Sequence, residues 1–490
     1  MGHGDHFDLV VIGSGPTGEK AAVKAAYFGK RVAVVEGERV LGGECRKAGL
    51  PSKVLREAAL SYSGARRRLG DLFRGTPGEP MKMQSFLRAC DEMCATHADR
   101  VAGNLERHGV TCLTGSARLV DPHRAVVKTA AGGEVSLGAD FFLIATGSRP
   151  AQVDFVPFGE PGIHLSDSIL EMERLPRTLT VVGAGVIGTE YASIFQALGV
   201  KVTLIDGRPR VLGFLDVEIH DRLLGELRER GMRTLLGHQV TACRVRAPGQ
   251  VEVETDHGAG VRAEALLFSG GRLANTERLG LEEVGVALGR HGRPVVDATF
   301  RTSVPSIFAA GDVIGFPALA STGMEQGRVA VAAAFPLEDQ AGRPDVLPLD
   351  STHPYPLLPY GIYTIPSVSM VGQTEEQVKE SGRAYVVGRA SYGDQDRGRL
   401  IGDATGMLKL VCDAATREVL GVHIVGETAE ELIHIGQACM HFHGTIEYFL
   451  RTVFNFPTLA ALYKAAAYDV LVRLGPERDR LAFAHGEASR

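Results

Sequence analysis

A glycine-rich pattern that occurs twice limits what this 490-residue chain can fold into. Residues 7–36 read FDLVVIGSGPTGEKAAVKAAYFGKRVAVVE: an apolar run, then Gly13, Gly15 and Gly18, an alanine-rich stretch, and a second apolar run that ends at Glu36. This order is typical of a βαβ unit, in which the glycines let a pyrophosphate approach the N-terminus of the helix. Glu36 is placed to accept hydrogen bonds from a ribose.

The same pattern returns at residues 178–206, TLTVVGAGVIGTEYASIFQALGVKVTLID. Gly183, Gly185 and Gly188 form the second fingerprint, and Asp206 is its terminal acid. One isolated GxGxxG can arise by chance, but two in a full βαβ context predict that the chain binds two dinucleotides.

The type of nicotinamide nucleotide is ambiguous from the second fingerprint. Asp206 favours the free 2′-hydroxyl of NAD. Arg208 and Arg210 follow directly and could pair with a 2′-phosphate. An enzyme that accepts both nucleotides could carry both features, and the alternative is that the arginines belong to a solvated loop.

The rest of the chain adds strands and then changes in character. FFLIATGSRP at 141–150 is an apolar strand that ends in a glycine turn, and LLFSGGRLANT at 266–276 repeats that arrangement. SVPSIFAAGDVIG at 303–315 is another apolar strand, closing on Gly311 and Asp312. From about residue 346 strands alternate with helices and no further GxGxxG occurs. The predicted fold class is α/β, with two Rossmann-like domains and a C-terminal α+β domain.

Composition excludes several functions. A formal net charge of -5 without a long basic run argues against a nucleic-acid surface. No run of about 18 apolar residues predicts a membrane span, and the N-terminus enters a strand without room for a signal peptide. Seven scattered cysteines fit reduced thiols and a cytoplasmic location. Cys90 and Cys94 lie one helical turn apart without a second pair or a nearby histidine, so we interpret them as core residues and predict no metal site.

These pieces, in this order, resemble the flavoprotein disulfide reductase family over roughly residues 7–475. The resemblance implies a discontinuous FAD-binding domain at 1–150 and 278–345, with an NAD(P)-binding domain at 151–277 between its halves. It further implies a dimerisation domain at 346–475, followed by a polar tail at 476–490. The cofactor is then FAD, NAD(P)H is the substrate, and the protein is a homodimer.

The resemblance also assigns roles to individual residues. Gly13, Gly15, Gly18 and Glu36 hold the ADP part of FAD, and Asp312 binds the ribityl or phosphate side of the flavin. Lys53, from Pro-Ser-Lys, and Glu190 match the pair that lies beside the flavin ring. The remaining residues expected at the two dinucleotides are Gly43, Ala145, Thr146, Gly147, Gly183, Gly185, Gly188, Asp206, Arg208, Gly271 and Gly311.

One departure from the family lies in residues 42–53, GGECRKAGLPSK. Disulfide-reducing members carry two cysteines separated by four residues, and the flavin-proximal one lies two positions before the proline of Pro-Ser-Lys. Here that position is Gly49, and the loop is one residue shorter. Cys45 matches only the outer thiol, so this segment cannot form the redox disulfide. Arg46 and Lys47 could lower the pKa of the Cys45 thiol, but we expect it to be inert.

A second departure lies in FNFPTLAALY at 454–463. Disulfide reductases have a histidine before Pro-Thr and, five positions later, a glutamate that orients this histidine, and the two together manage the proton of dithiol chemistry. Phe456 and Ala461 occupy these two positions. The thiol and the acid–base pair are therefore absent together.

An acceptor must then reach the flavin directly, and hydride transfer to or from a nicotinamide needs little acid–base help. The branch of soluble Si-specific NAD(P)+ transhydrogenases has this combination of features, although it usually carries an acid where this chain has Ala461. The resemblance therefore implies hydride transfer between NADPH and NAD+. The alternatives are an NAD(P)H-dependent quinone or oxygen reductase and a non-catalytic flavin-binding regulatory protein.

Overall fold

The computed structural model describes residues 6–38, 40–43, 49–68, 82–129, 132–258, 260–338 and 357–475. Cys45 and the predicted tail at 476–490 lie outside these described residues. The chain divides into two compact units. Unit 1 comprises Met1–Val54, Leu87–Gln152 and Gly270–Tyr355, and unit 2 comprises Leu55–Phe86, Val153–Ser269 and Pro356–Arg490.

Unit 1 is built on a mixed sheet whose parallel part has the order β3-β2-β1-β5-β16. β4 pairs antiparallel with the later part of β3 and the first part of β5. A small antiparallel pair joins β6 to β15. The strands are β1 (His6–Ile12), β2 (Val32–Glu36), β3 (Thr111–Asp121), β4 (Arg124–Thr129), β5 (Glu134–Ile144), β6 (Ser148–Pro150), β15 (Arg272–Ala274) and β16 (Ile307–Ala309).

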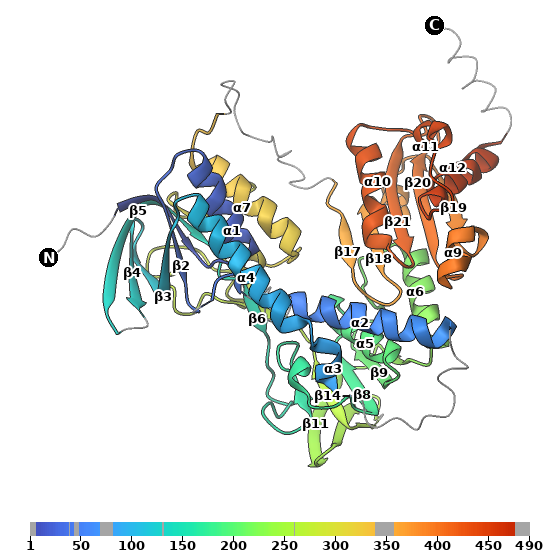
Figure 1. Ribbon diagram of the computed structural model, residues 1–490, viewed down its shortest axis with the longest axis horizontal. Helices are drawn as coiled ribbons and strands as arrows, with labels where there is room; N and C mark the ends of the chain where they lie inside the picture. Colours follow the sequence, from blue (N-terminus) through green and yellow to red (C-terminus); the bar gives the residue numbers. More distant parts are fainter. Residues whose placement is uncertain are drawn as a thin grey trace, which may run out of the picture. The chain divides into compact units, whose positions relative to one another are not determined.

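Helices α1 (Pro16–Tyr27) and α7 (Ala320–Ala334) lie side by side in unit 1 (Figure 1). Glycines on α7 allow this close approach, because a Cβ on Gly323 would lie 2.4 Å from Thr17 Oγ1 and one on Gly327 would lie 2.6 Å from Thr17 O. α4 (Cys90–Arg107) also contacts α1. The short helix η5 (Asp312–Ile314) follows β16.

The first part of unit 2 is a fully parallel sheet with the order β10-β9-β8-β14-β7. Helix α5 (Val186–Ala197) connects β8 to β9, and α6 (Val217–Glu229) leads into β10. A three-stranded antiparallel sheet of β11, β12 and β13 precedes β14. The strands are β7 (Ile163–His164), β8 (Thr178–Val182), β9 (Lys201–Asp206), β10 (Arg233–Leu236), β11 (Val240–Ala247), β12 (Gln250–Thr255), β13 (Val261–Ala263) and β14 (Ala265–Phe268).

The second part of unit 2 is an antiparallel sheet with the order β17-β18-β21-β20-β19. α10 packs on β18 and β21, and α12 packs on β19 and β20 (Figure 1). Tyr392, Phe449 and Tyr463 are fully buried in this core. The elements are β17 (Tyr360–Ile362), β18 (Val368–Gly372), α8 (Glu375–Glu380), β19 (Tyr385–Ser391), α9 (Asp396–Ile401), β20 (Met407–Asp413), β21 (Val419–Val425), α10 (Ala429–His441), α11 (Ile446–Arg451) and α12 (Ala461–Leu474).

A buried ion network joins the two parts of unit 2. Lys409 on β20 is 1% exposed, and its Nζ lies 2.8 Å from Asp216 Oδ1 and 2.6 Å from Glu375 Oε2. Asp216 is also the N-cap of α6, where it accepts from Glu218 N at 3.1 Å. One buried cation therefore neutralises carboxylates from both parts, as a buried charge requires.

The predicted α/β class, with a separate C-terminal α+β region, is confirmed. The remaining helices are α2 (Gly49–Arg68), which begins in unit 1 and continues into unit 2, α3 (Met83–Leu87), η3 (Ile169–Glu171), η4 (Arg290–Gly292) and η6 (Tyr392–Asp394). Among the described residues, none of the helices combines the length and apolar character needed to cross a membrane.

Candidate dinucleotide sites

Close packing sets the backbone of the first glycine turn. Gly13 has φ 105°, and a Cβ there would lie 2.4 Å from the carbonyl oxygen of Ala145. A Cβ on Gly18 would lie 1.9 Å from the carbonyl oxygen of Gly13. Gly15 differs, because a Cβ there would meet no described atom within 4 Å. The outer glycines are thus required by the fold, whereas Gly15 opens space in front of α1.

Glu36 is buried at the end of β2, with 8% exposure. One carboxylate oxygen accepts from Ser14 N at 2.9 Å and from Ser14 Oγ at 2.5 Å, and the other accepts from Glu38 N at 3.1 Å. Sequence reasoning missed Ser14, although its place between two fingerprint glycines marked it. Its hydroxyl connects the acid to the glycine turn.

The loop after β2 returns to the same turn. Gly42 N donates to Ser14 Oγ at 3.0 Å, and a Cβ on Gly43 would lie 3.2 Å from Gly15 Cα. The structure thus brings Gly43 beside the first fingerprint. The next residues, 44–48, lie outside the described part of the chain.

Gly311 and Asp312 lie against the first turn of α1. A Cβ on Gly311, where φ is 82°, would lie 2.4 Å from Thr17 Oγ1. Asp312 Oδ2 accepts from Ser148 Oγ at 3.3 Å, and Arg272 donates from Nε to that same hydroxyl at 2.7 Å. Ser148 and Arg272 were not predicted, and they hold Asp312 beside the first fingerprint.

The segment Ala145-Thr146-Gly147 follows β5 at the same edge of the sheet. Ala145 N donates to Ile12 O at 2.8 Å. Thr146 Oγ1 donates to Asn275 O at 2.8 Å, and Asn275 Nδ2 donates back to Thr146 O at 3.0 Å. Asn275 therefore fixes this segment next to the carboxyl ends of β1 and β5.

The arrangement in unit 1 fits the ADP part of FAD. Gly15 is the N-cap of α1, the cap lacks a side-chain hydrogen bond among the described residues, and Pro16 occupies the first turn. Backbone amides at such a helix N-terminus bind anions, and the open space at Gly15 admits a pyrophosphate. The buried Glu36 supplies the acceptor expected for a ribose.

The second fingerprint repeats this geometry in unit 2. Gly183 also has φ 105°, and a Cβ there would lie 2.5 Å from Ser269 O. A Cβ on Gly188 would lie 1.8 Å from Gly183 O. Gly185 is the N-cap of α5, and a Cβ there would approach only the Arg208 guanidinium, at 3.9 Å. The turn therefore fits a second dinucleotide by the same criteria.

Asp206 at the end of β9 is paired with a cation. It accepts from Ala184 N at 2.6 Å and from Arg208 N at 2.7 Å, and the Arg208 guanidinium donates through Nε at 3.0 Å and through one terminal nitrogen at 2.7 Å. Burial raises the pKa of Asp206, but these hydrogen bonds more than offset it and the net pKa is lowered. Arg210 instead donates to Leu215 O at 3.3 Å.

Glu190 lies on α5 with 7% exposure, and its Oε1 accepts from Tyr363 N at 2.8 Å. Lys53 is partly buried on α2 and belongs to unit 1. Their pairing beside the flavin stays a prediction. Gly271, also in unit 1, has φ 136° and accepts from Ala151 N at 3.0 Å. Its role at a cofactor likewise stays a prediction.

Arg56 is a buried residue that sequence reasoning missed. It is 3% exposed and donates to Ser367 Oγ at 2.7 Å and to Thr364 O at 3.4 Å. Its guanidinium also lies 5.4 Å from the ring centroid of Tyr363. Arg56 thereby fixes the segment whose backbone holds Glu190.

Burial keeps several thiols protonated at neutral pH. It raises the pKa of Cys90 to about 12 and those of Cys243 and Cys439 to about 11. Thiols with such pKa values are poor nucleophiles and poor electron carriers. Cys90 is buried, as predicted, whereas Cys94 is only partly buried.

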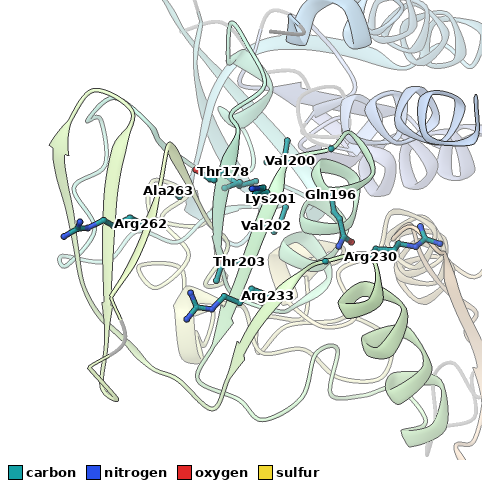
Figure 2. A pocket seen from close by; sticks show the side chains of 13 residues that line it. Thr178, Gln196, Val200, Lys201, Val202, Thr203, Arg230, Arg233, Arg262 and Ala263 are labelled. Carbon is teal, nitrogen blue, oxygen red and sulfur yellow. The ribbon is translucent and has the colours of Figure 1, made fainter. Parts of the chain in front are cut away.

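A pocket of about 530 Å³ lies at the amino-terminal ends of the strands of the second parallel sheet, away from the glycine turn (Figure 2). Its wall includes Thr178 and Lys201, the first residues of β8 and β9, whereas Gly183 and Asp206 belong to the carboxyl ends of these strands. Two of its four basic residues are paired, Arg230 with Glu226 and Arg262 with Glu252. The pocket is thus separate from the dinucleotide site.

Two βαβ turns with buried terminal acids, together with a C-terminal α+β region, define a two-dinucleotide flavoprotein oxidoreductase. The chain belongs to the pyridine nucleotide-disulphide oxidoreductase family, whose model matches residues 7–333, and the dimerisation domain of that family matches residues 358–467. The protein is an oxidoreductase with FAD as cofactor and NAD(P)H as substrate.

Individual relatives carry more specific names. The chain is 42% identical over 476 residues to the soluble pyridine nucleotide transhydrogenase of Mycobacterium bovis (strain BCG / Pasteur 1173P2), covering 96% of this chain and 98% of that one. It is 40% identical to the protein of the same name from Pseudomonas paraeruginosa, with coverages of 96% and 99%.

Solved structures agree in fold. The Cu(II) complex of the HOCl-induced flavoprotein disulfide reductase RclA from Escherichia coli has a TM-score of 0.83 at 25% identity, covering 95% of this chain and 99% of that one. LpdA from Mycobacterium tuberculosis has a TM-score of 0.83 at 26% identity, with coverages of 94% and 99%.

Proposed function

We propose that this flavoenzyme transfers hydride between NADPH and NAD+ through FAD without a redox-active disulfide. The observation that carries the proposal is the likeness to soluble pyridine nucleotide transhydrogenases over nearly the whole chain. The sequence agrees, because Gly49, Phe456 and Ala461 replace the proximal thiol, the histidine and the glutamate of disulfide chemistry. When bound, FAD supplies a centre that accepts and returns a hydride.

The chain's own groups bind and orient the reactants. The amides of the first turn of α1, Glu36 and Asp312 hold FAD. Gly183, Gly185 and Gly188 admit the nicotinamide nucleotide in front of α5. Lys53 and Glu190 act beside the reacting ring, where a fixed cation stabilises negative charge that reduction adds. NADPH and NAD+ occupy this nicotinamide site in turn, so the kinetics are ping-pong.

Arg208 supports use of both nucleotides. Its guanidinium neutralises Asp206, and its side chain is 62% exposed. It can therefore remain on Asp206 when NAD+ binds and turn to a 2′-phosphate when NADPH binds. In this proposal Asp206 serves the binding of NAD+ and Arg208 serves the binding of NADPH.

The decisive experiment supplies NADPH and thio-NAD+ to the enzyme under nitrogen. We expect reduction of thio-NAD+ with parallel lines in double-reciprocal plots. If the flavin is reduced and thio-NAD+ is not, while a quinone or oxygen is turned over rapidly, the protein is a reductase instead. If the flavin is not reduced at all, the non-catalytic alternative holds.

We further propose that the protein is a homodimer formed through residues 346–475. Phe456 is 83% exposed within one chain, and Val453 is 92% exposed. Two strongly exposed apolar side chains only three residues apart support an interface at this segment. We infer that Phe456 reaches toward the partner's flavin, in the place of a catalytic histidine. Light scattering at micromolar concentration should report a dimer, and a monomer would refute this.

A further inference from the structure

Two histidines and an aspartate meet beside the second parallel sheet. His238 follows β10, whereas Asp256 and His257 follow β12. One potential ligand atom from each residue lies within 4.8 Å of the other two. The ring centroids of His238 and His257 are 4.6 Å apart, and His257 Nε2 lies 3.8 Å from Asp256 Oδ1.

The backbone holds these two segments together. Asp256 N donates to Gln239 O at 3.0 Å, and Gln239 N donates to Asp256 Oδ1 at 3.0 Å. His238 N donates to Asp206 O at 3.1 Å. These hydrogen bonds hold the segments of His238 and Asp256 side by side, which reduces the entropy that a ligand must overcome.

One ring nitrogen of the cluster makes no hydrogen bond to the described residues. His238 Nδ1 is buried and has no hydrogen-bond partner among the residues that the structure describes. Leaving a buried polar atom unsatisfied costs roughly 1–3 kcal/mol. A cation that accepts the lone pair of this nitrogen would remove the penalty, and His238, Asp256 and His257 each offer one potential ligand atom within 4.8 Å of the other two.

We propose that His238, Asp256 and His257 form a binding site for a divalent transition-metal ion of the zinc class. Imidazole nitrogen suits Zn²⁺, Cu²⁺ and Ni²⁺, whereas Mg²⁺ and Ca²⁺ favour an all-oxygen shell. Three protein ligands and one water complete a tetrahedral Zn²⁺ site. With bonds of about 2.0–2.2 Å the ligand atoms must draw closer than 4.8 Å. Asp256 and His257 are exposed, so side-chain rotation can achieve this.

The site adjoins the nucleotide-recognition loop. Gly237 N donates to Arg208 O at 3.1 Å, and a Cβ on Gly207 would lie 2.4 Å from Gln239 Oε1. The segment that provides His238 is therefore packed on the loop from Asp206 to Arg208. A metal here lies beside the loop from Asp206 to Arg208, and none of its three ligands is a residue assigned to the two dinucleotides.

The test is equilibrium dialysis of the FAD-loaded enzyme against Zn²⁺, with bound metal counted per flavin. The variants are His238→Asn and His257→Asn, and the matched control is His291→Asn. His291 is exposed and has φ 62°, which asparagine tolerates. Wild type and control should bind one more Zn²⁺ per chain than the two variants, or bind it at least tenfold more tightly, since even outer-shell changes weaken metal sites by about 10–100-fold.

Two further readouts keep the proposal falsifiable. X-ray absorption at the zinc edge should show imidazole ligands in wild type, and excess Mg²⁺ should not displace the metal. The proposal is overturned if both variants bind Zn²⁺ with the stoichiometry and affinity of the control, or if wild type shows only sulfur ligation. An unchanged flavin content in all variants verifies that each is folded.

Discussion

The two glycine turns have the same backbone and differ in the charge beside their terminal acids. Gly13 and Gly183 share φ 105°, and the third glycine of each turn excludes a Cβ at 1.9 Å and 1.8 Å. In the first turn Glu36 is followed two residues later by Glu38, and in the second Asp206 is followed by Arg208. Each acid accepts the amide of that later residue, at 3.1 Å and 2.7 Å.

Only Arg208 adds its side chain to this amide contact. Glu36 is bound instead by the hydroxyl of Ser14, and among the residues that the structure describes no cation pairs with its carboxylate. We infer that the glycines determine where a pyrophosphate lies, and we propose that Arg208, two positions after the acid of the second turn, selects the ribose substituent of the nicotinamide nucleotide.

The largest effect should come from adding one methyl group to either turn. Gly18→Ala and Gly188→Ala each place a Cβ under 2 Å from a backbone oxygen, and overpacking of this kind costs about 1–3 kcal/mol or more. We expect Gly18→Ala to lose FAD, and Gly188→Ala to keep FAD but lose nucleotide binding. Flavin absorbance and nucleotide titration measure the two outcomes.

Gly225→Ala is the matched control, because a Cβ there meets no described atom within 4 Å on helix α6. It should keep both ligands and gain up to about 1 kcal/mol of helix stability. If Gly188→Ala released FAD as readily as Gly18→Ala does, the two turns would not be independent.

A smaller effect should follow from a substitution that leaves both glycine turns intact and removes only the cation proposed beside the flavin. Lys53→Met should leave the FAD content and NADPH affinity unchanged while slowing flavin reduction by about tenfold or more, equivalent to about 1.4 kcal/mol of transition-state stabilisation. Anaerobic stopped-flow reduction measures this. Equal rates in wild type and variant would remove Lys53 from the mechanism.

Cys45→Ser, in contrast, should retain most of the activity.

The comparison also shows what a sequence reveals about such a site. Glycine spacing predicted both turns and both terminal acids, because few residue types allow φ 105° or a backbone contact under 3 Å. The partners of the acids were not predicted. Whether Arg208 turns to Asp206 or to solvent depends on rotamers and on the amide of Arg208 itself, which spacing does not encode.

Contacts between distant segments were also beyond the sequence. Ser148 and Asp312, or His238 and His257, come together only through strand register and loop hydrogen bonds. A sequence indicates metal ligands most readily where they are close together in the chain, as with Cys90 and Cys94, whereas His238 and His257 follow two different strands. The domain boundaries and the pairing of Lys53 with Glu190 stay predictions.

Arg208 allows the comparison to be reversed. Arg208→Glu gives the second turn the acid-glycine-glutamate order of the first. We expect NADPH affinity to fall by about tenfold or more, because a charge-assisted hydrogen bond to phosphate contributes about 1.5–3 kcal/mol and part of it is offset by leaving Asp206. NADH affinity should change much less. Fluorescence titration with both nucleotides measures the ratio.

Arg210→Gln is the control for that swap, because Arg210 donates to the carbonyl of Leu215. It should leave the NADPH to NADH ratio near the wild-type value. If Arg208→Glu weakened both nucleotides equally, Arg208 would support the loop and would not select the phosphate.

The smallest effect should be the pH dependence of the ion pair itself. Asp206→Asn removes the charge that Arg208 neutralises, and we expect about 0.5–1 kcal/mol of lost stability at pH 7, since Arg208 is 62% exposed and solvent screens the pair. The pKa of Asp206 in the folded protein lies below its ordinary value of 3.8, because the Arg208 and amide hydrogen bonds outweigh burial. Its stabilisation is therefore present above about pH 4 and is lost as the pH falls through the lower, folded-state pKa.

Urea unfolding of wild type and Asp206→Asn at pH values between 7 and 3 measures this dependence. The difference in unfolding free energy should stay constant down to about pH 4 and shrink below it. Arg208→Gln should lose a similar amount, and the double variant should lose little more, because the two residues share one interaction. A difference that persists undiminished at pH 3 would show that Asp206 stabilises the loop through its amide contacts and not through its charge, and the contrast between the two turns would then rest on geometry alone.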